Sequence, residues 1–323
     1  MKHATKELQS MVAGGDALAE EKRQNRRLLD QLRQTTEQLE QARAARGLII
    51  PERKHRGAKP NVFARLICGD LHGSHADKEA VSAMLSDLKD LDVREVVLLG
   101  DMLECGGWMM QSHTLGYVAQ LDEVVYEDDV ANTNDFLDWI HKLCPRAAVH
   151  YIEGNHELRM ERWCVDAAQG NKRNAEYLLR AVGPQHVLFL EKRGIRYYRQ
   201  SETYGCETPG TFKLGKSFFT HSTECGKNAA SAMVERFAGC VFFGNTHRAA
   251  VATTRLVNVG LVSAWNPGCL CNLQPRWHHG SPTVWSHGYI LQIVNGEDDT
   301  FQAIPVPIYN GKSYLTTLLK TVR

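Results

Sequence analysis

The stretches "RLICGD" (65–70) and "EVVLLGD" (95–101) are apolar runs that each stop at Gly-Asp. Short apolar runs bounded by turn residues are typical of strands buried on both faces of a sheet. The residues between the two runs place apolar side chains at helical spacing, namely Val81, Met84, Leu85 and Leu88. Strand, helix and strand within about thirty residues predict a βαβ unit with two parallel neighbouring strands.

A carboxylate follows each of these two strands. In an open α/β sheet, ligands bind beyond the carboxyl ends of the strands, and a glycine allows the backbone to turn sharply there. We therefore expect Asp70 and Asp101 to be held by rigid strands while facing a crevice. We expect the intervening helix to begin at a capping box formed by Ser74 and Asp77.

The rest of the compact part, which we expect to begin at residue 62, follows less regular patterns. Residues 102–134 are polar and acidic, show no strong periodicity, and are expected to form a lid or rim. A helix around Phe136 and Ile140 and a third strand at 147–154 come next, and a helical stretch is expected at about 157–181. From about Val187 short strands alternate with Gly and Pro turns, and the tail after residue 288 predicts one or two edge strands.

The N-terminal residues 1–46 are rich in Gln, Glu, Arg, Ala and Leu. A heptad pattern indicates an amphipathic helix. The two interpretations of this segment are an oligomerising coiled coil and a solvated or partly disordered helix. The two sets of seam positions are Met11, Leu18, Asn25, Leu32 and Leu39, and Glu21, Leu28, Thr35 and Ala42. Residues 47–61 form a basic Pro/Gly linker, which we interpret as a solvated tether rather than a clamp on a phosphate backbone. From the coiled-coil alternative we expect a homo-oligomer.

Composition sets limits on the class of protein. The chain has 323 residues, a formal net charge of +1 and nine cysteines without a C-x-x-C pair. The N-terminus lacks the apolar region of a signal peptide, and no apolar run is long enough to span a bilayer. We expect a reduced, cytoplasmic protein without a membrane partner.

Polar side chains follow five of the expected strands. These residues are Asp70 and His72, Asp101, Asn155 and His156, His221, and Asn245 and His247. A mixture of oxygen and imidazole donors suits Mn, Fe, Zn or Ni. Because no thiolate is among them, the pattern argues against a structural zinc site.

These residues resemble the motifs of the calcineurin-like metallophosphoesterases. The motifs read Asp70-Leu71-His72-Gly73, Gly100-Asp101-Met102-Leu103-Glu104, Gly154-Asn155-His156-Glu157, His221, and Gly244-Asn245-Thr246-His247, followed by the turn Asn266-Pro267-Gly268. The resemblance spans about 64–270 and is closest to stand-alone, phage-type members. It implies an α/β fold of the metallophosphoesterase type over residues 62–323, a β-sandwich of two mixed sheets flanked by helices.

The resemblance also implies two divalent cations, with Mn²⁺ expected and Fe, Zn or Ni as alternatives. The first cation would take Asp70, His72, Asp101 and His247. The second would take Asp101, Asn155, His221 and Asn245. A carboxylate shared by both cations reduces their repulsion, and the pair stabilises an in-line displacement at phosphorus.

His156 would act near the leaving oxygen, as a general acid or by stabilising developing charge. Glu157 either orients that imidazole or is a carboxylate at a helix start. Arg159 and Arg162 are candidates for contact with substrate phosphate, with a surface position as the alternative. Asn245 stands where the family usually has His, and an amide oxygen is a weaker ligand, so we expect a looser second cation.

The implied activity is metal-dependent hydrolysis of phosphate esters. A phosphodiesterase or nuclease acting on nucleic acid, a phosphomonoesterase and a Ser/Thr protein phosphatase are the three alternatives. The last is disfavoured because Glu104-Cys105-Gly106 replaces the usual Asp-Arg-Gly. A different class, a non-catalytic oligomeric scaffold that kept the fold, also stays open.

Overall fold

The computed structural model describes residues 23–35, 37–38, 61–89, 91–105, 125–275 and 282–321. The chain divides into two units, Met1–Lys59 and Pro60–Arg323. In the first unit residues 23–35 are helical and exposed, including Leu28 and Leu32. The coiled coil stays a prediction, since most of its seam lies outside the described residues. The linker at 47–61 lies almost wholly outside them as well.

The second unit contains a six-stranded sheet in the order β11-β10-β1-β2-β3-β4. Its strands are β1 (Val62–Cys68), β2 (Val93–Leu98), β3 (Ala148–Ile152), β4 (Arg196–Tyr198), β10 (Gly288–Asn295) and β11 (Phe301–Pro307). Strands β1 to β4 run parallel to one another, whereas β10 is antiparallel to both of its neighbours, β1 and β11. The predicted βαβ unit is confirmed, with α2 (Lys78–Leu88) between the parallel pair β1 and β2.

A second, five-stranded sheet has the order β5-β6-β7-β9-β8. Its strands are β5 (Thr211–Leu214), β6 (Ser217–His221), β7 (Cys240–Gly244), β8 (Ala249–Leu256) and β9 (Gly260–Pro267). The pairs β6–β7 and β7–β9 are parallel, and β5–β6 and β8–β9 are antiparallel. Both sheets are therefore mixed, as the sequence predicted.

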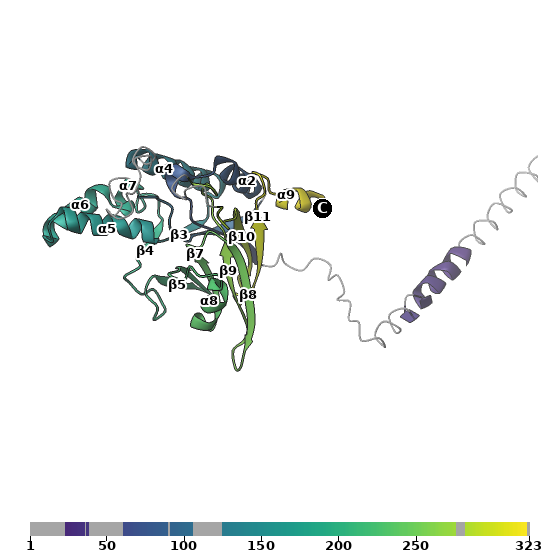
Figure 1. Ribbon diagram of the computed structural model, residues 1–323. Helices are drawn as coiled ribbons and strands as arrows, with labels where there is room; N and C mark the ends of the chain where they lie inside the picture. Colours follow the sequence, from purple (N-terminus) through teal and green to yellow (C-terminus); the bar gives the residue numbers. More distant parts are fainter. Residues whose placement is uncertain are drawn as a thin grey trace, which may run out of the picture. The chain divides into compact units, whose positions relative to one another are not determined.

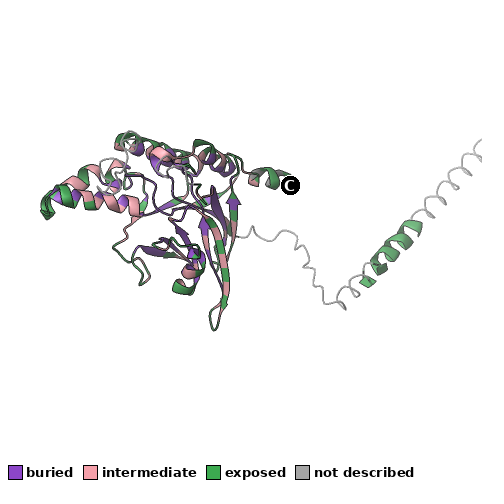
Figure 2. Ribbon diagram, viewed as in Figure 1, coloured by how far each residue is buried: buried purple, intermediate pink, exposed green. Residues whose placement is uncertain are grey.

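Helices cover the outer faces of this sandwich (Figures 1 and 2). Besides α2, the helices are α4 (Tyr126–Leu143), α5 (Asn155–Ala167), α6 (Lys172–Val182), α7 (Pro184–Val187), α8 (Ala229–Phe237) and α9 (Leu315–Thr321), and a short 3-10 turn η1 spans Gly73–His75. No helix within the described ranges has the length and apolarity needed to cross a membrane.

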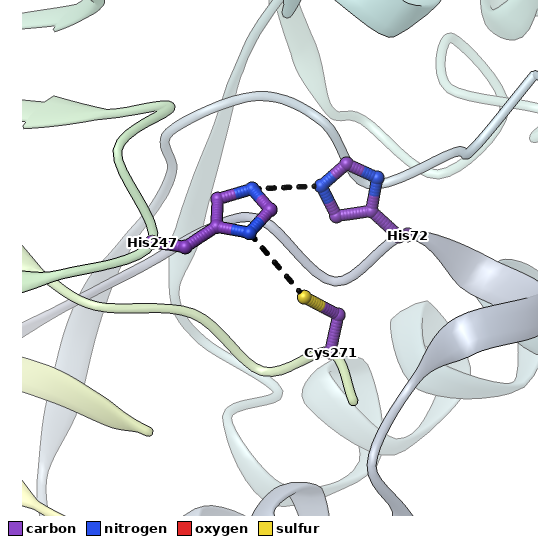
Figure 3. A group of neighbouring side chains, drawn as sticks. All are labelled: His72, His247 and Cys271. Atoms are coloured by element: carbon purple, nitrogen blue, oxygen red, sulfur yellow. Dashed lines mark hydrogen bonds between the residues drawn. The ribbon is translucent and has the colours of Figure 1, made fainter. Parts of the chain in front are cut away.

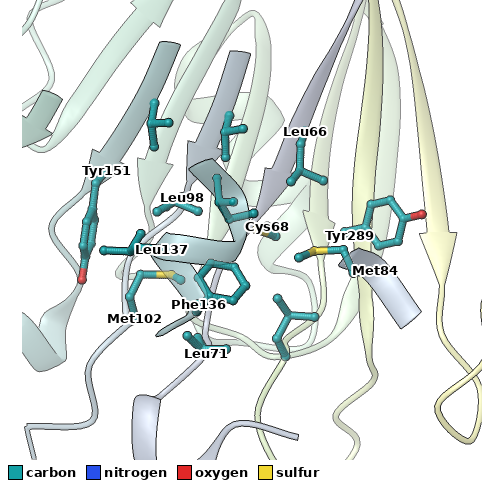
Figure 4. Packing of buried hydrophobic residues seen from close by; sticks show 14 of the residues in the cluster. Leu66, Cys68, Leu71, Met84, Leu98, Met102, Phe136, Leu137, Tyr151 and Tyr289 are labelled. Carbon is teal, nitrogen blue, oxygen red and sulfur yellow. The ribbon is translucent and has the colours of Figure 1, made fainter. Parts of the chain in front are cut away.

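The pleat of the strands divides the core into layers. On β1, Leu66 and Cys68 pack with α2 and α4 on the outer face of the first sheet (Figure 4). Ile67, between them, packs with Phe219 and Phe242 of the second sheet. Helix α8 covers the outer face of that second sheet. Because alternate residues point to opposite faces, the near-continuous apolar run in β1 is explained by burial on both sides.

Two local expectations were wrong, and two others were confirmed only in part. The N-cap of α2 is Asp77 alone, whose side chain accepts from Ala80 N, and Ser74 lies in the preceding turn. The segment expected to lack periodicity contains the first two turns of α4; residues 106–124 of it lie outside the described residues. The helical stretch after β3 is split into α5 and α6. Strand β10 is an interior strand, and only β11 is at the edge.

Candidate metal centre

Five loops meet where the two sheets present the carboxyl ends of their parallel strands. Three of these loops follow β1, β2 and β3 of the first sheet, and two follow β6 and β7 of the second. They bring together the buried side chains of Asp70, His72, Asp101, His221 and His247. Residues up to 177 positions apart in the sequence therefore form one buried polar cluster.

The backbone of these loops is strained. Asp70 (φ 51°), His72 (φ 52°), Asp101 (φ 49°), Asn245 (φ 83°) and His247 (φ 55°) all adopt the left-handed conformation. For residues other than glycine this conformation costs of order 1–3 kcal/mol each and is concentrated at functional sites. The strain is what turns each side chain back over the end of its strand.

Two glycines make the close packing of the loops possible. A Cβ on Gly100, which has φ +93°, would lie 2.6 Å from Nδ1 of His221. A Cβ on Gly154 would lie 2.0 Å from Oδ1 of Asp101. The glycines of the Gly-Asp and Gly-Asn-His stretches thus leave the space that the cluster occupies.

The first group of donors is Asp70, His72, Asp101 and His247. One ligand atom from each lies within 4.8 Å of the others, and all four residues are buried. Nε2 of His247 is 3.1 Å from Nε2 of His72 and 3.3 Å from Oδ1 of Asp70. Carboxylate and imidazole donors at these separations can surround a single divalent cation.

Glu104 fixes the orientation of His72. Its Oε2 lies 2.6 Å from Nδ1 of His72, so Nε2 faces the cluster. Burial opposes a charge on His72, but Glu104, Asp101 and Asp70 together raise its pKa to about 10. Burial likewise opposes the Glu104 carboxylate, yet His156 and His72 lower its pKa to about 2. Glu104 was not among the predicted site residues, although it ends the motif Gly100–Glu104.

The second group lies around His221. Its Nδ1 is 2.7 Å from the carbonyl oxygen of Leu99. Because a carbonyl oxygen can only accept, Nδ1 carries the proton, and the lone pair of Nε2 is left to bind a cation. That Nε2 is 2.9 Å from Oδ1 of Asn155 and 3.2 Å from Oδ2 of Asp101. Burial opposes a charge on His221, while Asp101 raises its pKa to about 9.

Asn245 follows β7 and contacts Asp70 and the segment after His221. Its backbone N–H donates to both carboxylate oxygens of Asp70, at 3.1 and 3.0 Å. Its Nδ2 donates to the carbonyl oxygen of Ser222 and lies 3.3 Å from Sγ of Cys225. Because Nδ2 is committed to Ser222, Oδ1 is the atom of this side chain that is available as a ligand.

His156 lies beside Asp101 and His72. Its backbone N–H donates to Oδ1 of Asp101 at 2.9 Å, and its Nδ1 is 2.7 Å from the carbonyl oxygen of Glu104. Since that carbonyl can only accept, Nδ1 carries the proton and Nε2 faces Oδ2 of Asp101 at 3.9 Å. Burial lowers the pKa of this imidazole. Arg159 Nη1 lies 3.1 Å from Nδ1, so it contacts the ring, whereas Arg162 is exposed on α5.

Glu157 is a carboxylate at the start of α5, as one alternative predicted, but it is not on the surface. It is buried and accepts hydrogen bonds from the backbone N–H of Asp101 (3.1 Å), Met102 (2.8 Å), Leu103 (3.0 Å) and Gly154 (2.8 Å), and from the hydroxyl of Tyr151 (2.6 Å). It therefore stabilises the loop that carries Asp101 instead of orienting His156 or lying on the surface. Burial and the nearby Asp101 charge raise its pKa, against the effect of these donors.

Asp129 on α4 has a similar role that the sequence did not predict. Its carboxylate accepts from the backbone N–H groups of Ser74 (3.1 Å), Glu104 (3.1 and 3.0 Å) and Cys105 (3.0 Å). It thus links the loop after β1 to the loop after β2. The only signal available in the sequence was the presence of acids in the first turn of a helix.

One atom shows that the cluster suits a cation. Oδ2 of Asp101 is buried and has no hydrogen-bond partner among the described residues. It lies 3.2 Å from Nε2 of His221, 3.9 Å from that of His156 and 4.0 Å from that of His72. A buried carboxylate oxygen without a hydrogen bond is costly, and a metal ion would satisfy it. The surrounding residues therefore fit divalent cations, with Asp101 placed between the two donor groups.

Comparison with known proteins places this cluster in a family. Residues 64–223 match the family model of the calcineurin-like phosphoesterases. Curated proteins give no match. These residues therefore form a calcineurin-like phosphoesterase domain, of a family that binds divalent metals.

Solved structures of low overall similarity include Vacuolar Protein Sorting 29 from three organisms. The protein from Cryptosporidium parvum has a TM-score of 0.39 and 11% identity, covering 78% of this chain and 94% of its own. For a single mutant from Entamoeba histolytica the values are 0.34, 11%, 78% and 96%. For the protein from Chaetomium thermophilum they are 0.33, 10%, 75% and 93%. At these scores the likeness carries no argument about function.

Proposed function

We propose that this protein is a metal-dependent phosphoesterase that hydrolyses a phosphodiester with two divalent cations. The supporting observation is the buried Oδ2 of Asp101, which lacks a hydrogen bond and lies between the two donor groups. We assign Asp70, His72, Asp101 and His247 to one cation, and Asp101, Asn155, His221 and Asn245 to the other. When bound, such a pair activates a water molecule and neutralises charge on the phosphate.

The side chains of the protein perform the remaining work. With Nδ1–H donating to the carbonyl of Glu104, His156 presents Nε2 to the centre and can hold the proton that the leaving oxygen needs. The guanidinium of Arg159, 3.1 Å from the same ring, is positioned to meet a phosphate oxygen. Glu104 keeps His72 in the tautomer that directs Nε2 at the cluster.

The activity is tested with bis-p-nitrophenyl phosphate and Mn²⁺. We expect turnover that chelation abolishes and that Asp101→Ala reduces by several orders of magnitude. Asp128→Ala, at an exposed position on α4, is the control and should behave like wild type. Parallel assays with p-nitrophenyl phosphate, single-stranded DNA and a phosphopeptide distinguish a diesterase or nuclease from a monoesterase or protein phosphatase.

One observation favours a scaffold instead of an enzyme. Asn245 provides a weaker amide ligand where the family usually has an imidazole. Such a substitution is expected in a site that has lost activity. The scaffold alternative predicts metal-independent background rates on every substrate, equal in wild type and Asp101→Ala.

A further inference from the structure

Cys271 contacts a residue of the candidate metal centre but lies outside the motifs of the family. It lies on the segment after the Asn266–Gly268 turn and is 2% exposed. Its Sγ is 3.7 Å from Nδ1 of His247, within the range of a hydrogen bond to sulfur, as Figure 3 shows. The metal-capable groups include a set formed by Cys271 with His72 and His247.

Both ring nitrogens of His247 have neighbouring side chains. His72 faces Nε2 at 3.1 Å, and Asp70 Oδ1 is 3.3 Å from the same atom. Cys271 faces the other nitrogen, Nδ1 (Figure 3). Because one ion cannot bind both nitrogens of a single imidazole, a cation bound to Nε2 of His247 would leave Nδ1 to the sulfur.

We propose that Cys271 is a positioning residue for His247. Its sulfur accepts the Nδ1–H of His247, which leaves the lone pair of Nε2 directed at the first cation position. Histidine ligands of metals almost always donate their other N–H to an acceptor that fixes the tautomer and the ring orientation. Here a thiol provides the acceptor. This inference rests on the proposed metal function.

The segment that carries Cys271 is fixed to the centre by its backbone. The carbonyl oxygen of Cys271 accepts from Nε2 of His287 at 2.8 Å. One residue earlier, Leu270 N donates to the carbonyl oxygen of Asp70 at 3.1 Å. The same segment thus contacts the loop that carries Asp70 and, through Cys271, the ring of His247. On the ring of His247, Trp285 packs edge-on with the centroids 4.1 Å apart.

The test measures Mn²⁺ binding to the full chain by titration calorimetry. Cys271→Ala should weaken the tighter site about 10- to 100-fold, the usual effect of losing a partner of a metal ligand. Cys271→Ser, whose hydroxyl can also accept, should recover most of that affinity. The control is Cys144→Ala, a buried thiol at the end of α4 that packs in the hydrophobic cluster on the outer face of the first sheet. Metal-free melting temperatures separate a loss of folding from a loss of positioning.

Two further readouts distinguish positioning from direct ligation. In the metal-bound wild type, ¹⁵N NMR should show the proton of His247 on Nδ1. The Co²⁺ form should lack a sulfur-to-cobalt charge-transfer band. The proposal is overturned if Cys271→Ala binds Mn²⁺ like wild type, if Cys144→Ala loses as much affinity, or if a band appears that Cys271→Ser removes. Absence of phosphodiester hydrolysis with these affinity changes intact would instead overturn only the proposed activity.

Discussion

Oε2 of Glu104 lies 2.6 Å from Nδ1 of His72, and both residues are buried. The contact joins the loop after β2 to the loop after β1. It fixes which nitrogen of His72 faces Asp101, and it places a negative charge behind an imidazole that is expected to bind a cation. The carboxylate that ends the second motif therefore contacts His72, and its Oε2 also lies 3.4 Å from Nδ1 of His156.

Glu104→Gln should weaken binding of the first cation about 10- to 100-fold, because the neutral amide holds the imidazole less strongly. Mn²⁺ titration of the variant measures the effect. Glu127→Gln, at an exposed position in the first turn of α4, is the control. Equal affinity in Glu104→Gln and wild type would show that this contact does not support the metal centre.

Asn245→His should tighten the second cation, because imidazole is a stronger donor than an amide oxygen for a borderline transition metal. Wild type should retain less than two equivalents of Mn²⁺ after gel filtration, and the variant should retain more. Elemental analysis of the eluted protein gives the stoichiometry. Two tightly held equivalents in wild type would contradict the idea of a weak second site.

Asp129→Asn should lower the free energy of unfolding by about 2–3 kcal/mol, because an amide nitrogen would face a backbone donor in either orientation. Both oxygens of Asp129 accept from backbone N–H groups, so neither position tolerates a second donor. Urea denaturation measures the change, and Asp128→Asn on the exposed face of α4 is the control. A loss shared equally by both variants would point to the helix terminus instead of the buried bonds.

His150 should make the protein sensitive to acid. Burial, and then Arg196 and Arg65, lower its pKa to about 4. Between pH 6.5 and 4 the unfolded chain therefore binds more protons at this residue than the folded protein. The free energy of unfolding falls as the pH drops through this window, by about 3 kcal/mol in total.

Urea denaturation at pH 7 and pH 5 tests this expectation. His150→Gln should show a smaller difference between the two pH values than wild type. His186→Gln, at an exposed position, should keep the wild-type difference. The same pH dependence in all three proteins would assign the acid sensitivity to other groups.

The sequence predicted the parts of the site that local pattern specifies. Asp70 and Asp101 each follow an apolar run and a glycine, and that pattern was enough to place them at one edge of a sheet. The role of Glu157 depended on backbone donors from another loop, which no spacing reveals. Glu104 could have been found from its motif, but its contact with His72 joins separate loops.

Errors in the fold have similar causes. The start of α4 was missed because its buried face includes Asp129 and Thr133, so the apolar periodicity begins only at Phe136. The acids in its first turn were the usable signal. Strand β10 pairs with β1 from more than 200 residues away, and such a pairing is not visible in the local sequence.

Anomalous diffraction from crystals soaked in Mn²⁺ would locate the cations themselves. We expect two peaks about 3.5–4 Å apart, bridged by Asp101, with His72 and His247 beside one and Asn155 and His221 beside the other. Peaks only at surface carboxylates, with the buried histidines still facing one another, would contradict this expectation.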